Sequence, residues 1–309
     1  MKKSAFIFSG QGSTYQGMGK DFYENFKSVR YLYDEASDIF DFDLAKISFD
    51  GDAQTLAKTE IAQPLIYTLS MGIYNIFKEY AVPYAIAGHS LGEYAALTVA
   101  GAFTVEQGFT LIKARANAMK QASEKGKGVM YAIMGSDEKT IQSICENIEG
   151  YVLPVNYNSH AQTVIAGEEE ACNQAVQCLS EQGAKAIKLP VSSAFHTNFM
   201  EQAGVDLKTV ASTMNLKPNV PNFYSNLTGT KLEIIEDVPD YMCKHMVSPV
   251  LFTSQLMAMQ QDGIENFIEM GCGKTLTGLV KKTLKGIGYQ SIEDVKTLEK
   301  AKELVLPNE

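Results

Sequence analysis

Apolar residues in the N-terminal part of the chain form short continuous runs, each followed by a stretch with helical spacing. Runs of about four apolar residues that end near a glycine are typical of buried parallel strands. Strand-then-helix pairs are predicted over residues 5–8 and 20–40 and over 84–87 and 90–100, with further helices over 61–79 and 105–122. Alternation of this kind predicts an α/β protein with a parallel sheet.

The pattern changes after a glycine-containing break at residues 126–128. Strands and helices then follow in the order β-α-β-β-α-β within about 65 residues, which is the ferredoxin-like arrangement. These elements are predicted over residues 129–134, 138–147, 151–156, 162–166, 168–181 and 184–190. Because the set is self-contained, we expect residues 126–191 to form a small domain inserted into a larger α/β domain made of residues 1–125 and 192–309. Longer units return afterwards, as helices over 199–214 and 250–262 and strands over 222–225 and 264–270.

Composition narrows the class of protein. The chain has 309 residues, of which 45% are hydrophobic, so it can bury a full core without disulfide bonds. Its five cysteines are scattered and form neither a CxxC pair nor a zinc-ligand spacing, which predicts reduced thiols, no metal site and a cytoplasmic location. The first apolar stretch ends after about four residues, too short for the core of a secretion signal. No stretch approaches the roughly 20 apolar residues of a membrane span, so no membrane contact is expected.

The charge of the chain bears on its partners. The formal net charge is −9, which argues against nucleic acid because phosphate binding needs a basic surface. An acidic protein partner would require a local basic patch, and the one candidate is the group Lys281, Lys282 and Lys285. Lysines at the end of a predicted helix also suit the helix dipole, so a solvated helix end is the favoured explanation of these residues.

The segment Gly88-His89-Ser90-Leu91-Gly92 fits the Gly-x-Ser-x-Gly nucleophile elbow. The motif needs a strand before it and a helix after it, because the chain must turn sharply to hold the serine hydroxyl above the sheet. Both neighbours are predicted here. Ser90 is therefore the candidate nucleophile, and the backbone N–H of Leu91 is placed to stabilise an oxyanion. A tight strand-to-helix turn without chemistry is the alternative.

A serine nucleophile needs a base, normally histidine, and the chain has four histidines. His89 precedes the nucleophile and should point away from its hydroxyl, while His160 lies in a turn of the predicted insertion. His196 lies where the chain re-enters the large domain, at a seam where clefts form. His245 comes just before a predicted helix. On these grounds His196 is the first candidate base and His245 the second; no Asp or Glu stands out as a third member, so a backbone carbonyl would orient the base.

Arg115 is the other candidate for a functional residue. It borders the apolar stripe of the predicted helix 105–122. A guanidinium there either reaches outward to solvent or holds a buried anion through two hydrogen bonds. The residue pattern alone favours the outward orientation.

Several ordered motifs together resemble one family along nearly the whole chain. They are Phe8-Ser9-Gly10-Gln11-Gly12, Ile61-Ala62-Gln63-Pro64, Gly88-His89-Ser90-Leu91-Gly92-Glu93-Tyr94, the helix of Arg115, Asn156-Tyr157-Asn158-Ser159, Gln162-Thr163-Val164-Ile165-Ala166-Gly167, Ala194-Phe195-His196-Thr197, Asn226-Leu227-Thr228-Gly229, Ser248-Pro249-Val250 and Glu269-Met270-Gly271-Cys272-Gly273-Lys274. The chain resembles the malonyl-CoA:acyl-carrier-protein transacylases of fatty-acid synthesis. The resemblance implies a hydrolase-like large domain with a ferredoxin-like insertion, in agreement with the pattern above.

The resemblance also implies roles for individual residues. Ser90 would be the nucleophile, and His196 would take and return its proton. The backbone N–H groups of Gln11 and Leu91 would form the oxyanion hole. Arg115 would grip the free carboxylate of the malonyl group, contrary to the outward orientation. Gln63 and Asn158 would line the pocket or belong to its hydrogen-bond network. Phe195, beside the base, resembles the malonyl-type pattern rather than the methylmalonyl-type.

The chain departs from the family pattern at two positions. His245 stands where relatives commonly have glutamine. In the family this position orients the base through its backbone carbonyl, which any residue supplies, so a side-chain role of His245 is in doubt. Cys272 stands where a proline is usual, with no consequence expected for the chemistry.

The implied reaction is a ping-pong transfer of malonyl from malonyl-CoA, through a serine ester, to the phosphopantetheine thiol of an acyl carrier protein. No cofactor is expected, and a monomer is. An acyltransferase that serves a polyketide synthase would have the same fold and site. A serine hydrolase such as a thioesterase is a second alternative, but the chain has no histidine after His245 to complete the usual Ser…Asp…His order. A non-catalytic module that binds carrier protein is a third, and the presence of both Ser90 and His196 argues against it.

Overall fold

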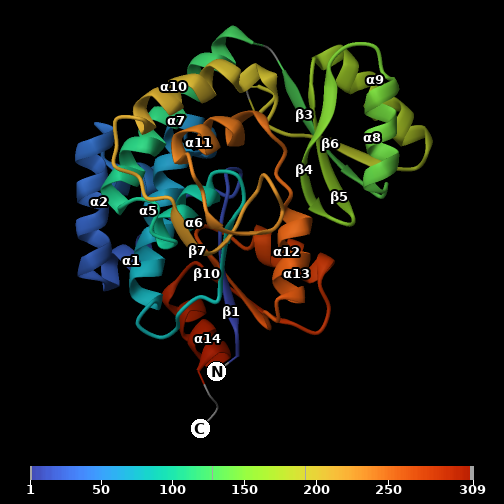
Figure 1. Ribbon diagram of the computed structural model, residues 1–309. Helices are drawn as coiled ribbons and strands as arrows, with labels where there is room; N and C mark the ends of the chain where they lie inside the picture. Colours follow the sequence, from blue (N-terminus) through green and yellow to red (C-terminus); the bar gives the residue numbers. More distant parts are fainter. Residues whose placement is uncertain (1, 127, 192, 307–309) are drawn as a thin grey trace.

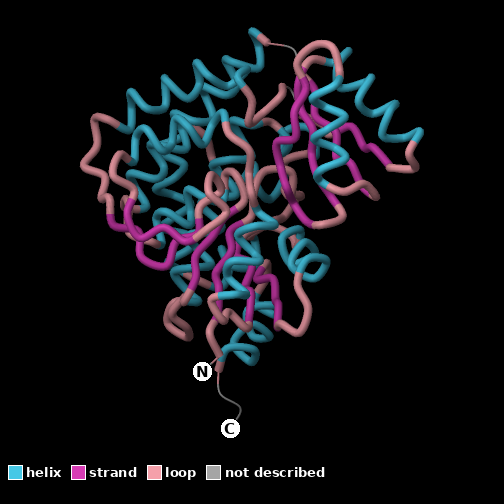
Figure 2. The backbone as a smooth tube through the Cα atoms, turned by 45° about the vertical axis from the view of Figure 1, so that its right-hand side comes forward, coloured by secondary structure: helices cyan, strands magenta, loops and turns pink. Residues whose placement is uncertain are grey.

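A computed structural model of the chain describes residues 2–126, 128–191 and 193–306. Its strands form two separate sheets, one of six strands and one of four, and Figure 2 shows them as two groups. Lys127, in the predicted break, and Ser192, at the predicted return to the large domain, lie outside the described residues. The α/β fold class predicted from the sequence is confirmed.

The larger sheet has the strand order β10-β9-β1-β2-β7-β8. These strands are β1 (Ser4–Phe8), β2 (Ala85–Gly88), β7 (Asn219–Tyr224), β8 (Lys231–Ile234), β9 (Asn266–Met270) and β10 (Gly288–Ile292). All neighbours pair in parallel except β7 and β8, which are antiparallel. The parallel part is the arrangement that the alternation of strands and helices predicts.

Helices cover both faces of this sheet, which explains why its central strand is a continuous apolar run. Phe6 and Phe8 of β1 pack into one hydrophobic cluster, while Ala5 and Ile7 pack into a second cluster on the opposite face. Successive side chains of a strand point to opposite faces, so a strand buried on both sides must be apolar throughout. In Figure 1, α5 and α7 lie on one side of this sheet and α12 and α13 on the other.

The helices around the larger sheet include those predicted over 61–79, 90–100, 105–122, 199–214 and 250–262. They are α1 (Lys20–Asn25), α2 (Lys27–Phe40), α3 (Leu44–Asp50), α4 (Ala53–Ala57), α5 (Thr59–Phe77), α6 (Gly92–Val99), α7 (Val105–Lys125), the short 3-10 helix η1 (Asn198–Met200), α10 (Glu201–Ala211), α11 (Val238–Val247), α12 (Phe252–Gln261), α13 (Thr275–Thr283) and α14 (Val295–Val305). The single helix predicted over 20–40 is wrong, because Phe26 adopts an extended conformation (φ −124°, ψ 115°) between α1 and α2.

The smaller sheet has the order β4-β5-β3-β6, and all its neighbours are antiparallel. Its elements are β3 (Val129–Met134), α8 (Glu138–Asn147), β4 (Val152–Ser159), β5 (Gln162–Gly167), α9 (Glu169–Glu181) and β6 (Lys185–Lys188). This is the predicted β-α-β-β-α-β order. Both helices lie on the outer side of the sheet in Figure 1 and bury a hydrophobic cluster of their own against it. We propose that residues 126–191 form an inserted domain, and this separate cluster supports that division.

Strand β4 connects the small sheet to the rest of the molecule. The N–H of Tyr157 donates to the carbonyl of Val250 (2.9 Å), and the N–H of Val250 donates to the carbonyl of Val155 (2.8 Å). These bonds join the edge strand of the small sheet to the segment between α11 (Val238–Val247) and α12. A crevice at the carboxyl ends of parallel strands is where ligands bind in open α/β sheets.

Candidate active site

The nucleophile elbow lies between β2 and α6, as predicted. Ser90 has φ 51°, a left-handed conformation that costs free energy for a residue other than glycine. The two glycines of the motif allow the chain to close around it. A Cβ atom at Gly88 would lie 2.0 Å from the backbone of Gly92, and one at Gly92 would lie 2.0 Å from the carbonyl oxygen of Phe8. The sharp turn therefore requires both glycines.

Replacing Gly92 by alanine should destabilise the protein by roughly 3 kcal/mol, because the backbone must shift to remove the contact with Phe8. Urea unfolding monitored by circular dichroism measures the change. The matched control is Gly278→Ala in α13, where an added Cβ meets nothing within 4 Å. That variant should be as stable as the unmodified protein or more stable by about 0.5 kcal/mol. Equal stability of the two variants would contradict the close approach at the elbow.

The predicted base, His196, is in direct contact with the candidate nucleophile, Ser90. Its Nε2 lies 2.7 Å from Ser90 Oγ. Its Nδ1 lies 3.0 Å from the carbonyl oxygen of Ser248 and 3.3 Å from that of His245. Carbonyl oxygens only accept hydrogen bonds, so Nδ1 carries the proton and Nε2 is left to accept the hydroxyl of Ser90. The two carbonyls thus orient the base, as the sequence predicts in the absence of an acidic third member.

The surroundings of His196 keep it neutral. Burial, followed by the positive charge of Arg115 and the neighbouring His89, lowers the pKa of His196 to about 3. A neutral imidazole is the form that accepts a proton, so the base is ready at neutral pH. His196 also has φ 61°, so both members of the Ser90–His196 dyad are held in left-handed backbone conformations.

The rate of serine acylation should therefore be independent of pH from about 8 down to about 5, without the inflection near 6.5 that an ordinary histidine gives. Single-turnover acylation measured across this range tests the expectation. The folded-state pKa lies below the unfolded value of 6.5, so the unfolded state binds more protons and stability falls as pH falls below 6.5. Thermal unfolding at each pH separates this loss from a change in rate. A titration of the rate near 6.5 in fully folded protein would contradict a buried, neutral His196.

Arg115 lies on α7 and is 2% exposed, so the outward orientation that the residue pattern favours is wrong. Its Nη2 donates to Ser90 Oγ (3.4 Å), and its guanidinium lies 5.2 Å from the ring centre of Tyr94. No carboxylate forms an ion pair with it among the described residues, and its Nε has no hydrogen-bond partner there. A buried charge without a carboxylate partner is costly, so Arg115 is a candidate group for binding an anion beside Ser90.

A cavity of about 380 Å³ opens in front of these residues, between the small sheet and the carboxyl ends of β1 and β2. Among its lining residues are Gln11, Asn158 and Phe195, three of the predicted site residues. Asn158 Oδ1 lies 2.7 Å from His89 Nε2, so the side chain of His89 is engaged by β4 of the small sheet and not by Ser90. Gln63 does not line the cavity but contacts two residues that do. Its Nε2 donates to Gln11 Oε1 (3.4 Å) and to Met119 Sδ (3.2 Å).

The predicted oxyanion hole is compatible with the backbone. Leu91 is the first residue before α6, and Gln11 lies in the turn after β1, next to β2 in the sheet. Neither N–H donates to another described residue in a hydrogen bond that involves the elbow or this turn. The N-terminus of a helix favours developing negative charge. A role for these two groups is a proposal that the arrangement supports.

His245 precedes α12, the helix predicted over 250–262, but it also lies in the last turn of α11, a helix that the sequence did not predict. Its carbonyl oxygen faces His196, whereas its imidazole points to Asn226 and Glu93. Three residues with contacts at this site were not predicted to have a role, although all belong to the motifs quoted above. They are Asn226, Glu93 and Ser248, the last through its carbonyl. Only their positions in those motifs could have singled them out.

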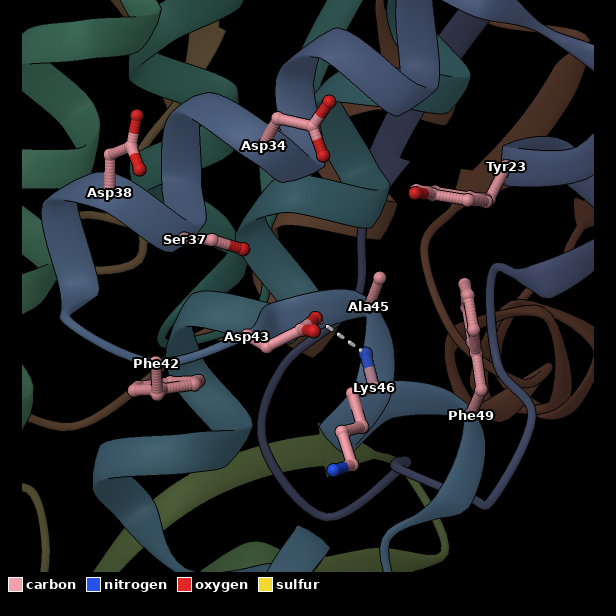
Figure 3. Close-up of a pocket in the computed structure, with 9 residues that line it drawn as sticks. All are labelled: Tyr23, Asp34, Ser37, Asp38, Phe42, Asp43, Ala45, Lys46 and Phe49. Atoms are coloured by element: carbon pink, nitrogen blue, oxygen red, sulfur yellow. Dashed lines mark hydrogen bonds between the residues drawn. The ribbon is translucent and has the colours of Figure 1, made fainter.

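A second hollow, of about 600 Å³, lies on the surface between α1, α2 and α3 (Figure 3). Asp34, Asp38 and Asp43 line it, but Asp43 already caps α3 by accepting the N–H of Lys46 (2.8 Å). None of the candidate site residues lines this hollow, and no buried unpartnered group is among the residues that Figure 3 labels. The chemistry of the described chain is therefore concentrated in the cavity at Ser90.

Known proteins are similar to this chain in sequence and in fold. Residues 5–305 match the acyl transferase domain family. Over 97% of its length the chain is 35% identical to the malonyl CoA-acyl carrier protein transacylase of Bacillus subtilis (strain 168), covering 96% of that protein. It is also 35% identical to the transacylase of Escherichia coli (strain K12), over 98% of this chain and 100% of that protein. The chain belongs to the malonyl CoA-acyl carrier protein transacylase family.

Solved structures of transacylases agree with this assignment. The Clostridium perfringens enzyme superposes with a TM-score of 0.91 at 34% identity, over 97% of this chain and 96% of that one. A malonyl-transacylase solved in complex with its type II PKS acyl-carrier protein superposes with a TM-score of 0.92 at 33% identity, over 97% and 99% of the two chains. The hydrolase-like large domain with a ferredoxin-like insertion, which the resemblance implies, is thus the fold of this transacylase-family member.

Membrane-spanning helices and metal-ligand clusters are both absent from the described residues. No helix of the described chain combines the length and the apolar composition that crossing a membrane requires. Within the same residues, no group of three or more His, Cys, Asp or Glu side chains is placed to hold a metal ion. The expected absence of a cofactor in this transacylase-family member stays a prediction.

Proposed function

We propose that this chain transfers the malonyl group from malonyl-CoA to the phosphopantetheine thiol of an acyl carrier protein. One observation carries the proposal. The unpaired, buried guanidinium of Arg115 lies 3.4 Å from Ser90 Oγ, which itself lies 2.7 Å from a neutral histidine. A nucleophile, its base and a fixed cation in one cavity suit an acyl group that carries a carboxylate of its own.

In the first half-reaction Ser90 attacks the thioester carbonyl of malonyl-CoA. The hydroxyl proton passes to Nε2 of His196 as the Oγ–C bond forms, and the N–H groups of Gln11 and Leu91 hold the oxyanion of the tetrahedral intermediate. The C–S bond then breaks, and the leaving thiolate of CoA takes the proton from His196. The result is a malonyl ester on Ser90 and a free CoA thiol.

In the second half-reaction the thiol of the carrier protein occupies the place that CoA left. His196 accepts the thiol proton as sulfur attacks the ester carbonyl, and it returns that proton to Ser90 Oγ when the C–O bond breaks. One thioester is consumed and another of similar energy is formed, so the exchange requires neither ATP nor a metal ion. The two halves share one site, which makes the kinetics ping-pong.

Arg115 provides the selectivity for the acyl group. The malonyl carboxylate would pair with its guanidinium and satisfy a charge that the folded protein leaves unpaired. An acetyl group would leave that charge buried and uncompensated, which costs free energy in the transition state. Phe195, which is 8% exposed and lines the cavity, would limit the room beside the malonyl group.

The identity of the acceptor has a specific second candidate. One similar structure is of a malonyl-transacylase with a type II PKS acyl-carrier protein, so a polyketide carrier protein would fit the same chemistry. For either acceptor, the exposed lysines 281, 282 and 285, at and beyond the end of α13, stay a predicted contact. Transfer rates to fatty-acid and polyketide carrier proteins, measured side by side, distinguish the two. A cytoplasmic location and a monomeric state likewise stay predictions.

Steady-state kinetics test the proposed function. With malonyl-CoA varied at several fixed concentrations of holo carrier protein, double-reciprocal plots should give parallel lines, because CoA leaves before the carrier protein binds. The product is identified by the mass of malonyl carrier protein. Release of free malonate from malonyl-CoA, at a rate that carrier protein does not change, would instead show a hydrolase.

A further inference from the structure

A buried polar cluster lies directly beneath the nucleophile elbow, and no step of the proposed transfer uses it. Its members come from α6, from the loop after β7 and from α11. They are Glu93, Ser225, Asn226, Tyr241 and His245, and each is at most 8% exposed. Buried polar groups are costly unless their hydrogen bonds are satisfied, so a cluster of five beside a catalytic serine calls for a physical explanation.

Asn226 is the member that touches the elbow. Its Oδ1 accepts the backbone N–H of Ser90 (2.8 Å), and its Nδ2 donates to the carbonyl oxygen of Gly88 (2.6 Å). One side-chain amide thus holds the end of β2 and the strained nucleophile together. Gly88 is the last residue of β2 and Ser90 lies in the turn after it, so the amide supplies hydrogen bonds at the point where the strand ends.

Glu93 holds Asn226 in place. Its Oε2 accepts the backbone N–H of Asn226 (2.6 Å), and its Oε1 accepts the hydroxyl of Tyr241 (2.5 Å). Glu93 lies on α6, three residues after Ser90. The helix that begins at the elbow is thereby bound to the same loop whose asparagine grips the elbow. Burial raises the pKa of Glu93 to about 8, and the hydrogen bonds from Tyr241 and from the backbone of Asn226 limit that rise.

His245 supplies the last contact, through its side chain. Its Nε2 lies 3.3 Å from Asn226 Oδ1 and 3.6 Å from Glu93 Oε1. Asn226 Oδ1 is an amide oxygen that already accepts from Ser90, so the hydrogen bond requires a proton on Nε2 of His245. Its Nδ1 is then unprotonated, which agrees with its having no partner among the described residues. The amide orientation of Asn226 is thereby fixed by two donors, Ser90 N–H and His245 Nε2–H.

The backbone of His245 acts on the other half of the dyad. Its carbonyl oxygen lies 3.3 Å from Nδ1 of the base, His196. The side chain of one residue therefore supports the nucleophile through Asn226, while its main chain supports the base. Displacement of this residue would change both sides of the 2.7 Å contact between Ser90 and His196.

We propose that Asn226 and His245 are positioning residues for proton transfer from Ser90 to His196: Asn226 clamps the nucleophile elbow, and the imidazole of His245 fixes the amide of Asn226. The inference rests on the proposed function only in taking Ser90 as the nucleophile. It requires a hydrogen-bond donor at position 245, which histidine and glutamine supply and leucine lacks. Loss of the clamp misplaces Ser90 Oγ without altering the cavity that binds the acyl donor, so it changes kcat rather than KM.

The test compares Asn226→Asp, His245→Leu and His245→Gln with the unmodified protein. We expect kcat for malonyl transfer to fall about 30-fold in Asn226→Asp and about tenfold in His245→Leu, with KM for malonyl-CoA changed by less than about twofold. His245→Gln should retain at least about a third of the unmodified kcat. The matched control is Asn266→Asp, the same substitution at a buried asparagine of β9 outside the cavity, and it should leave kcat within about twofold.

A second readout does not depend on malonyl-CoA. A fluorophosphonate probe reacts with an activated serine by forming a P–O bond and releasing fluoride, and its labelling rate at Ser90 reports how well the hydroxyl is positioned. The variants should be labelled more slowly in the same order as their kcat values.

If the unmodified protein is labelled at Ser90 but transfers no malonyl group, the proposed function fails and the clamp is still tested by the labelling rates. If Asn226→Asp does not fold, the comparison of His245→Leu with His245→Gln still tests whether the donor at position 245 positions Ser90.

Three results would overturn the inference. The first is a kcat and a labelling rate in His245→Leu within twofold of the unmodified protein. The second is an equal loss in His245→Leu and His245→Gln, which would show that volume rather than the donor matters. The third is a loss in Asn266→Asp as large as in Asn226→Asp, which would show a general effect of a buried carboxyl on stability.

Discussion

Replacing Ser90 by alanine should lower kcat for malonyl transfer by a factor of at least about 10⁴ and abolish the acyl-enzyme. Both half-reactions form or break a bond at Ser90 Oγ, so no alternative route remains once the oxygen is removed. His196 and Arg115 would remain in place, but both contact Ser90 Oγ, and the variant has no hydroxyl there to replace it. Single-turnover transfer of radiolabelled malonyl from malonyl-CoA measures the loss.

The fold of the Ser90→Ala variant should be unaffected, because alanine tolerates the left-handed conformation about as poorly as serine does. An unchanged midpoint of thermal unfolding would show this. The control is Ser212→Ala at the end of α10, where the hydroxyl bonds only to the carbonyl of Lys208, and its rate should match that of the unmodified protein. Retention of more than about 1% of kcat in Ser90→Ala would contradict covalent catalysis by this residue.

Replacing Arg115 by methionine should reduce the preference for malonyl-CoA over acetyl-CoA by about 100- to 1,000-fold. Methionine has a similar length and removes the charge, so the cavity keeps its volume while the malonyl carboxylate loses its partner. That carboxylate would then be desolvated without compensation, whereas the acetyl group would no longer leave a guanidinium unpaired. The ratio of kcat/KM values for the two donors, measured under the same conditions, gives the change.

The control for this variant is Arg30→Met, at the only other arginine of the sequence. Arg30 donates to the backbone carbonyl of Glu24 and is not among the residues that line the cavity. Its replacement should leave the ratio unchanged. A preference for malonyl-CoA that survives Arg115→Met would mean that another group recognises the carboxylate, and the proposed origin of selectivity would then be wrong.

The sequence predicts the elements and residues whose signals are local. Gly88, Ser90 and Gly92 form a compact motif whose spacing already encodes the turn, and the continuous apolar run of β1 reflects burial on both faces. The insertion is predictable for the same reason, because its strands and helices are short, regular and contiguous. His196 follows from its place at the return to the large domain.

Other features depend on contacts between remote segments and leave no such signal. The residue pattern predicts an outward-pointing Arg115 beside an apolar stripe. Only the tertiary fold shows that its Nη2 lies 3.4 Å from Ser90 Oγ. The contact of Glu93 with Asn226 joins residues 133 positions apart, and no local pattern in either segment predicts it. Helix α11, which contains His245, was not predicted, because it has only ten residues (Val238–Val247) and a proline in its first turn.

Short elements were missed for a related reason. Helices α3 and α4 have seven and five residues, and edge strands β8 and β10 have four and five. Segments of this length hold too few apolar positions to establish a period, so turns, caps and packing decide their structure. None of them contributes a side chain to the Ser90–His196 dyad, which is why the chemistry was more predictable than the complete fold.

Intact-protein mass spectrometry after brief incubation with malonyl-CoA tests the central claim most directly. The unmodified protein should gain one malonyl group, the Ser90→Ala variant should gain none, and addition of holo carrier protein should remove the adduct and produce malonyl carrier protein. An adduct that disappears equally fast without carrier protein would show hydrolysis in place of transfer. Failure of the unmodified protein to form any adduct would contradict the assignment of malonyl-CoA as the donor to Ser90.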